Sequence, residues 1–122
     1  MGKKVLVVDD SSTIRQQVAQ TLAESDFSVI EAVDGKHGIE MITKNPDIAL
    51  VIIDINMPNM NGLEMLEALK ADGKNATLPV IMLTTEVDGR LVERAKKGGA
   101  AGWLVKPYKP PQLLAVVTKL AR

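Results

Sequence analysis

The sequence contains no cysteine, and this absence excludes disulfide bonds, thiolate zinc sites and cysteine nucleophiles. It also has no net charge, since 15 lysine and arginine residues balance 15 aspartate and glutamate residues. A balanced chain has no overall attraction to nucleic acid, although a local basic patch is compatible with it. The longest apolar run, 48–53, is far too short to span a bilayer. We therefore expect a cytoplasmic protein that binds neither nucleic acid nor membrane.

Glycine-rich phosphate loops are missing as well. A dinucleotide-binding protein carries G-x-G-x-x-G after its first strand, but here Asp9 and Asp10 occupy that turn. Two carboxylates would repel a pyrophosphate group in the absence of a metal ion. We expect no nucleotide cofactor.

What the sequence does contain is typical of one globular domain. It has 122 residues, of which 46% are hydrophobic and 25% charged, enough for a substantial core. Composition does not shift along the chain, and there is neither a repeat nor a linker. We expect a single domain over residues 1–122, with any output domain on another polypeptide.

Short apolar runs alternate with helical patterns along the whole chain. The runs predict five strands, at 4–8, 27–31, 49–53, 79–83 and 101–105. Between and after them, apolar residues recur at helical spacing, as in Ile14, Val18 and Leu22, then Ile39 and Ile42, and then Leu63, Leu66 and Leu69. A fourth helix is predicted over about 88–97, and a fifth begins at Pro110 and buries Leu113, Val117 and Leu120. Strict alternation predicts an α/β fold: a parallel sheet with helices on both faces.

Polar side chains stand at the ends of four of the five predicted strands. They are Asp9 and Asp10 after the first, Asp54 after the third, Thr84 after the fourth and Lys106 after the fifth. The second strand contributes no comparable group. Ligands of an open parallel sheet bind beyond the carboxyl ends of its strands. We therefore expect three carboxylates, a hydroxyl and an ammonium group to converge at one edge.

This combination of groups suits phosphoryl transfer. Three carboxylates without cysteine or a nearby histidine form a hard oxygen site that is suited to Mg²⁺, which would relieve their mutual repulsion. An aspartate such as Asp54 can also act as a nucleophile and form an acyl phosphate. The Mg²⁺ ion, Lys106 and Thr84 would then neutralise the phosphoryl oxygens.

On these residues the chain resembles the receiver domain of two-component response regulators, most closely the stand-alone chemotaxis type. The resemblance covers essentially the whole chain, including Met57-Pro58 and Gly62 after Asp54 and Pro107 after Lys106. It implies a doubly wound (βα)5, flavodoxin-like fold with strand order 2-1-3-4-5; that order is taken from the family. It also implies an Mg²⁺ site made by Asp10, Asp54 and the Asn56 carbonyl, with Asp9 acting partly through water.

The resemblance further implies a signalling protein that is not an enzyme on an external substrate. A sensor histidine kinase would donate its phosphoryl group to Asp54, and the receiver would assist its own phosphorylation and dephosphorylation. In the family, the positions held here by Asn56 and Glu86 tune self-dephosphorylation, and a separate phosphatase is a further partner.

The family also implies a switch and an output surface. Phosphorylation would draw Thr84 toward Asp54 and let the aromatic residue on the fifth strand, here Trp103, rotate inward. The family more often has tyrosine or phenylalanine there, so ordinary packing of the larger indole at the sheet edge is the alternative. The readout face would be helix four, strand five and helix five of a monomer, contacting an output partner such as the flagellar motor switch. Its candidates are Arg90, Arg94, Lys97, Trp103 and Lys119, with a solvated helix face as the alternative for the charges.

Two other functions compete with this one. The first is a phosphorelay intermediate that passes its phosphoryl group to a histidine phosphotransfer protein. The second is a haloacid-dehalogenase-like phosphatase, which also uses an aspartate nucleophile with Mg²⁺. That family needs D-x-D, whereas the residue two positions after Asp54 is Asn56. A DNA-binding regulator is disfavoured because nothing follows the fifth predicted helix.

Overall fold

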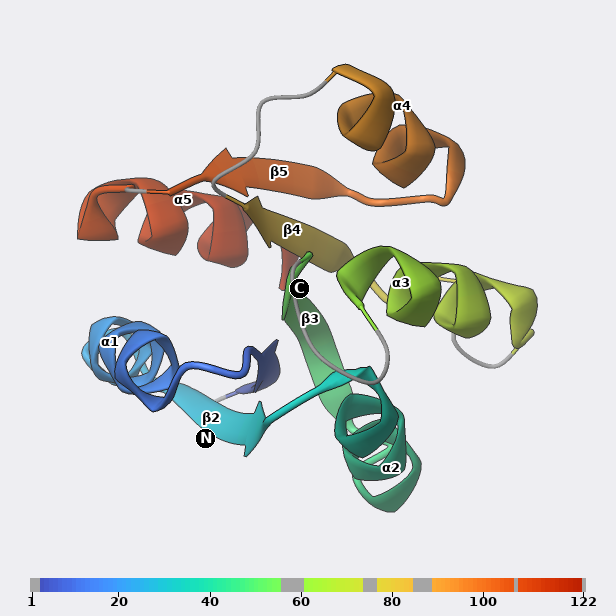
Figure 1. Cartoon of the computed structure of the whole chain (residues 1–122). Helices are drawn as coiled ribbons and strands as arrows, with labels where there is room; N and C mark the ends of the chain where they lie inside the picture. The colour runs from blue at the N-terminus through green and yellow to red at the C-terminus, as the bar shows by residue number, and fades with distance from the viewer. Residues whose placement is uncertain (1–2, 56–60, 74–76, 85–88, 107, 122) are drawn as a thin grey trace.

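The structure is a computed structural model that describes residues 3–55, 61–73, 77–84, 89–106 and 108–121. Strands and helices alternate strictly along the chain (Figure 1). Their bounds are β1 (Lys3–Val8), α1 (Ser12–Ala23), β2 (Phe27–Ala32), α2 (Gly35–Lys44), β3 (Ile48–Asp54), α3 (Gly62–Ala71), β4 (Val80–Thr84), α4 (Gly89–Lys97), β5 (Gly102–Val105) and α5 (Pro110–Leu120). No strand end differs from its predicted position by more than one residue.

The strands form one parallel sheet in the order β2-β1-β3-β4-β5. This confirms the fold class and the strand order that the resemblance implied. Because the order reverses between β1 and β3, the loops after these two strands diverge to opposite faces, and the crevice between them is where such sheets bind ligands. Asp9 and Asp54 lie at that point.

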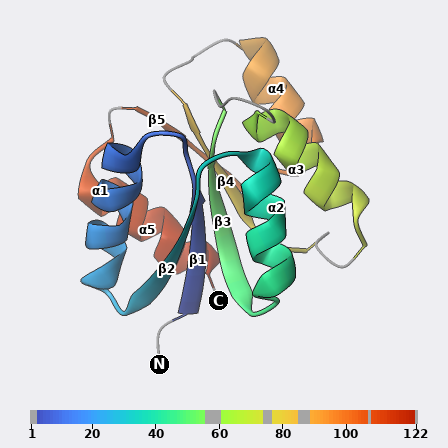
Figure 2. The same cartoon turned by 60° about the horizontal axis from the view of Figure 1, so that its bottom comes forward.

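Helices cover both faces of the sheet (Figures 1 and 2). On one face, buried residues of the central strands such as Leu6 and Val51 pack against α2, α3 and α4. On the other, alternate residues such as Val5 and Ile52 pack against α1 and α5. The central strands therefore read as continuous apolar runs, because both of their faces are buried. In the described part of the chain, none of the helices is both long and apolar enough to cross a membrane.

Side-chain caps fix where the helices after the site begin. The Ser11 side chain accepts a hydrogen bond from the Ile14 N–H, which begins α1 directly after the acidic pair. Asn61 and Glu64 form a capping box at the start of α3. The next residue, Gly62, approaches the phosphoacceptor strand so closely that a Cβ atom there would lie 2.3 Å from the Asp54 carbonyl oxygen. Residue 62 therefore has no room for a side chain beside the Asp54 backbone.

Candidate functional site

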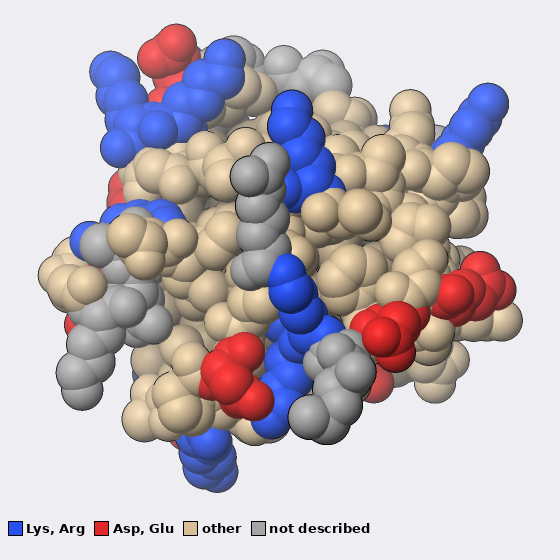
Figure 3. All heavy atoms as spheres, turned by 180° about the vertical axis from the view of Figure 1, so that it is seen from behind, with Lys and Arg blue, Asp and Glu red and all other residues tan. Residues whose placement is uncertain are grey.

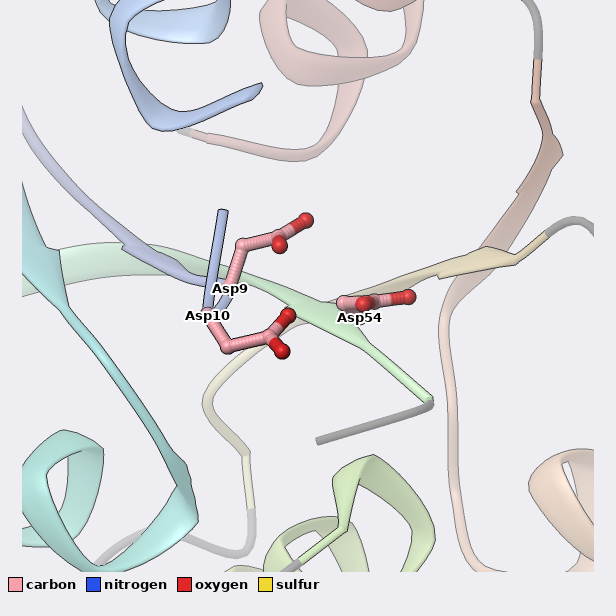
Figure 4. A group of neighbouring side chains, drawn as sticks. All are labelled: Asp9, Asp10 and Asp54. Carbon is pink, nitrogen blue, oxygen red and sulfur yellow. The ribbon is translucent and has the colours of Figure 1, made fainter. Parts of the chain in front are cut away.

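The structure brings the predicted acidic residues together at the carboxyl edge of the sheet. Asp9 and Asp10 follow β1 directly, and Asp54 is the last residue of β3. Their side chains extend into the same region (Figure 4), and one carboxylate oxygen of each lies within 4.8 Å of those of the other two. Lys106 directly follows β5, and its Nζ contacts both Asp9 and Asp54.

The side chain and the backbone N–H of Asp9 are hydrogen-bonded to neighbouring residues. Its side chain is 1% exposed, its Oδ1 accepts a hydrogen bond from the Ser11 N–H at 2.9 Å, and its Oδ2 accepts one from Lys106 Nζ at 3.2 Å. Its own N–H donates to the Ala32 carbonyl at 3.1 Å. Both carboxylate oxygens of Asp9 are therefore already engaged by the protein.

Asp10 and Asp54 differ from Asp9 in their surroundings. Asp10 is exposed, whereas the Asp54 side chain is only 9% exposed and its Oδ1 lies 3.4 Å from Lys106 Nζ. Lys106 therefore bridges the two buried carboxylates, and its own side chain is 16% exposed. Among the described residues, the Lys106 ammonium group contacts two of the three clustered carboxylates, and a divalent cation would relieve the repulsion between them further.

A hard divalent cation fits this donor set. Three carboxylates of which one is exposed, in a sequence without cysteine, are the kind of oxygen ligands that Mg²⁺ takes while it keeps several waters. Asp10 and Asp54 are the residues that would hold it directly. The expected contributions of the Asn56 carbonyl, of Glu86 and of the Thr84 side chain lie outside the described part of the structure.

A groove runs from the site along α1. It has a volume of about 620 Å³ and lies between Gln17 and Gln20 of α1 and the segment with Lys106, Tyr108 and Pro110. Tyr108 is partly buried in its wall. Burial raises the pKa of the Tyr108 phenol, and the negative charge of Asp9 raises this pKa further.

The predicted readout residues lie on α4, β5 and α5. Trp103 is partly buried and packs against the core cluster under α3 and α4, beside a cavity of about 170 Å³ that Val92 and Ala95 also line. Arg90, Lys97 and Lys119 are exposed. From behind, charged side chains of both signs gather at the corner formed by α4 (Figure 3).

Arg94, the fifth predicted readout residue, binds across to α3. Its Nη2 lies 2.7 Å from Glu67 Oε1 and its Nε 3.0 Å from Glu67 Oε2. This bidentate contact lowers the pKa of Glu67 and raises that of Arg94. Both side chains are nearly half exposed, so this residue of the predicted readout face makes a helix–helix contact at the protein surface.

The second strand contributes no residue to the acidic group, but it provides a partner for an arginine beside that group. Glu31 lies near the end of β2, opposite Val7 of β1. Its Oε1 lies 3.0 Å from Arg15 Nε, and the two side chains form an ion pair. Arg15 Nη1 also donates to the Asp9 carbonyl oxygen at 2.7 Å. The missed signal is the position of Arg15, one helical turn into the helix that the acidic pair precedes.

Comparisons with known proteins agree with this geometry. Residues 5–118 match the family model described as the response regulator receiver domain. A chemotaxis protein CheY homolog of Campylobacter jejuni is 42% identical over 111 residues, covering 90% of this chain and 85% of the relative. Chemotaxis protein CheY1 of Helicobacter pylori is 40% identical and covers 90% of both chains.

Solved structures give the same result. The chemotaxis protein CheY4 of Vibrio cholerae superposes with a TM-score of 0.92 at 38% identity, covering 98% of this chain and 99% of that one. The family match, the shared strand order and the acidic cluster at the switch point lead to one conclusion. This chain belongs to the family of response regulator receiver domains.

Proposed function

We propose that this chain is a single-domain response regulator, over residues 1–122, that accepts a phosphoryl group on Asp54 from a sensor histidine kinase in the cytoplasm. The observation that carries the proposal is the convergence of Asp10, Asp54 and Lys106 at the switch point of the sheet. An acceptor carboxylate, a cation beside it and an exposed second carboxylate for a metal ion are the groups that this transfer requires.

The chemistry assigns a separate task to each residue. An Asp54 carboxylate oxygen attacks the phosphorus atom of the phosphohistidine, and the phosphorus–nitrogen bond breaks. Its electron pair leaves with the imidazole, which takes up a proton. Lys106 Nζ, 3.4 Å from Asp54 Oδ1, is placed to stabilise the negative charge of the transferring group.

Asp10, Asp54 and the Asn56 carbonyl would hold an Mg²⁺ ion, which when bound supplies further neutralisation of the phosphoryl oxygens. Asp9 orients Lys106 through the 3.2 Å contact with its Oδ2, and it would contact the Mg²⁺ ion partly through water. Hydrolysis of the acyl phosphate returns the Asp54 carboxylate and releases inorganic phosphate, with Asn56 and Glu86 tuning its rate.

The output is a change in the surface formed by α4, β5 and α5. The phosphoryl group attracts the Thr84 hydroxyl, and Trp103 reports the rearrangement at the adjacent strand. The proteins named above as relatives are chemotaxis proteins, which supports an output partner in chemotaxis, such as the flagellar motor switch. The protein acts as a monomer with a kinase, an output protein and a phosphatase as partners.

A fluorescence titration tests the proposal, because Trp103 is the sole tryptophan of the sequence. We expect its emission to change on addition of Mg²⁺ and to change again with beryllofluoride, a mimic of the phosphoryl group. The second change should vanish in Asp54→Asn. The control is Asp72→Asn, which replaces an exposed aspartate at the end of α3 and should behave as wild type. A wild-type protein that is insensitive to both additions contradicts the proposal.

A pull-down then separates the regulator from a phosphorelay intermediate. The beryllofluoride form and the free form would be immobilised side by side and their bound proteins compared. An output protein that binds the beryllofluoride form selectively supports the switch. Rapid transfer of the phosphoryl group from Asp54 to a histidine phosphotransfer protein would instead support the relay, and steady turnover of phosphate monoesters would favour a phosphatase.

A further inference from the structure

We infer that Arg15 is a positioning residue of the acidic site: with its charge neutralised by Glu31, it holds the peptide between Asp9 and Asp10 and thereby sets the affinity of Asp10 for Mg²⁺. This inference rests on the proposed function, in which Asp10 is a direct ligand. It concerns a contact between α1, β2 and the loop after β1, none of which carries the phosphoryl group.

The contacts form a short chain from β2 to the site. Glu31 Oε1 accepts from Arg15 Nε at 3.0 Å, and Arg15 Nη1 donates to the Asp9 carbonyl oxygen at 2.7 Å. A hydrogen bond from a charged donor at this distance is among the stronger ones in proteins. The Arg15 side chain is 14% exposed, so the bond is made largely away from water.

The accepting carbonyl is what links Arg15 to the metal site. It belongs to the peptide group that joins Asp9 to Asp10, and that group is planar and rigid. Fixing its oxygen, together with the bond from the Asp9 N–H to Ala32, fixes the Cα atom from which the Asp10 side chain extends. Asp10 is exposed, so the backbone is the element of its position that the fold can control.

An electrostatic role and a positioning role of Arg15 predict opposite changes in Mg²⁺ affinity when the arginine is removed. If Arg15 acted only through its charge, removing it would leave Glu31 unpaired beside the site, and the added negative charge would strengthen Mg²⁺ binding. If Arg15 holds the peptide, its removal weakens binding because Asp10 loses its fixed origin. Outer contacts of metal ligands often change affinity about tenfold or more when they are lost.

The test uses the double variant Arg15→Met/Glu31→Gln, which leaves the net charge unchanged and keeps the buried length of the arginine stem. Mg²⁺ affinity would be measured by isothermal titration calorimetry, and the backbone amides of Asp9, Asp10 and Ser11 would be followed by NMR without Mg²⁺. We expect about tenfold weaker binding and shifted, broadened amide signals in this loop. Arg15→Met alone should weaken binding, and Glu31→Gln alone should weaken it less.

The other arginine–glutamate pair provides the matched control. Arg94→Met/Glu67→Gln removes the same chemical pair from α3 and α4, which pack in the core cluster on the sheet face opposite to α1, and should leave Mg²⁺ affinity unchanged. Arg15→Lys/Glu31→Gln, which keeps one cationic donor for the Asp9 carbonyl, should recover part of the lost affinity. This variant also serves if the methionine variant does not fold.

The outcomes separate the inference from the proposed function. Wild-type affinity in the Arg15→Met/Glu31→Gln variant, or tighter binding in Arg15→Met, overturns the inference while the proposed function stands. A wild-type protein that binds no Mg²⁺ overturns both. Weakened binding in the double variant with a normal α3–α4 control supports the positioning role.

Discussion

Two arginine–glutamate pairs cross between elements of this protein, and they differ in what surrounds them. At the carboxyl edge of the sheet, Arg15 is 14% exposed and also binds a backbone carbonyl. On the α3–α4 face, Arg94 binds only the Glu67 carboxylate among the contacts described above and is 48% exposed. The Arg94 pair has the better geometry, with two short hydrogen bonds.

For the stability of the fold, the burial of the arginine and its additional bond to a backbone carbonyl should matter more than the ion pair itself. An exposed pair exchanges protein contacts for equally good contacts with water, and salt screens what remains. A guanidinium that also satisfies a shielded carbonyl cannot be removed without leaving that carbonyl short of a donor. At the carboxyl edge the arginine is shielded and has a third partner, whereas the contact between α3 and α4 is open to water. A switch that moves the α4 side would exploit this difference.

The largest expected difference in stability is between alanine substitutions at the two ends of α3. Gly62→Ala at the carboxyl edge places a Cβ atom 2.3 Å from the Asp54 carbonyl oxygen. Because the obstructing atom is backbone, we expect a loss of about 2 to 3 kcal/mol in the free energy of unfolding. Gly73→Ala beyond the far end of α3 meets nothing within 4 Å and should cost nothing. Urea denaturation of both variants measures this; equal stabilities would show that the edge can relax.

A direct comparison of the two arginines should give the next largest effect. Arg15→Met should lower the free energy of unfolding by about 1 to 2 kcal/mol, since the Asp9 carbonyl loses a charged donor. Arg94→Met should lower it far less. The same urea experiment, repeated at high salt, distinguishes them, because the Arg15 loss should persist. If Arg94→Met proved the more destabilising variant, the comparison between the two regions would be reversed.

Tyr108 offers a smaller, local probe of the carboxyl edge. It is the sole tyrosine of the sequence, and its pKa is raised first by burial and then by the charge of Asp9. In Asp9→Asn the pKa should fall toward the ordinary value of 10.0 and remain above it, because the burial is unchanged. Ultraviolet absorbance of the phenolate follows the titration. An unchanged pKa would mean that the Asp9 charge is screened from the ring.

The smallest effect is the pH dependence of the Glu67–Arg94 pair. The folded state lowers the Glu67 pKa below its ordinary value of 4.5, so the pair contributes stability above that value. This contribution is lost as the pH falls through the lowered pKa of the folded state. The difference in urea midpoint between wild type and Glu67→Gln should therefore be small at neutral pH and disappear in acid. A difference that grows in acid would contradict the sign of the shift.

The sequence was sufficient to predict what depends on strand order and strand ends. Asp9, Asp54 and Lys106 each follow an apolar run, so the parallel sheet alone brings them to one edge. The prediction was that these groups converge at one edge, and the structure brings the three carboxylates and Lys106 together there.

The cross-element contacts could not be predicted in the same way. Whether Arg15 meets Glu31, or Arg94 meets Glu67, depends on the rotation of a helix about its axis and on its distance from a neighbour. Periodicity identifies which face of α1 is buried through Val18 and Leu22, but it does not tell which polar residue at the border of that face reaches a carbonyl. The nearest clue in the sequence is the position of Arg15, one helical turn into the helix that follows the acidic pair.

The most direct test of the phosphoacceptor role is the intact mass of the protein after incubation with acetyl phosphate. With Mg²⁺ present, wild type should gain the mass of one phosphoryl group, and the adduct should be lost in hydroxylamine, as expected of an acyl phosphate. Asp54→Asn should gain nothing, and neither should wild type with a chelator in place of Mg²⁺. A stable adduct on Asp54→Asn, or equal labelling without Mg²⁺, would contradict the account.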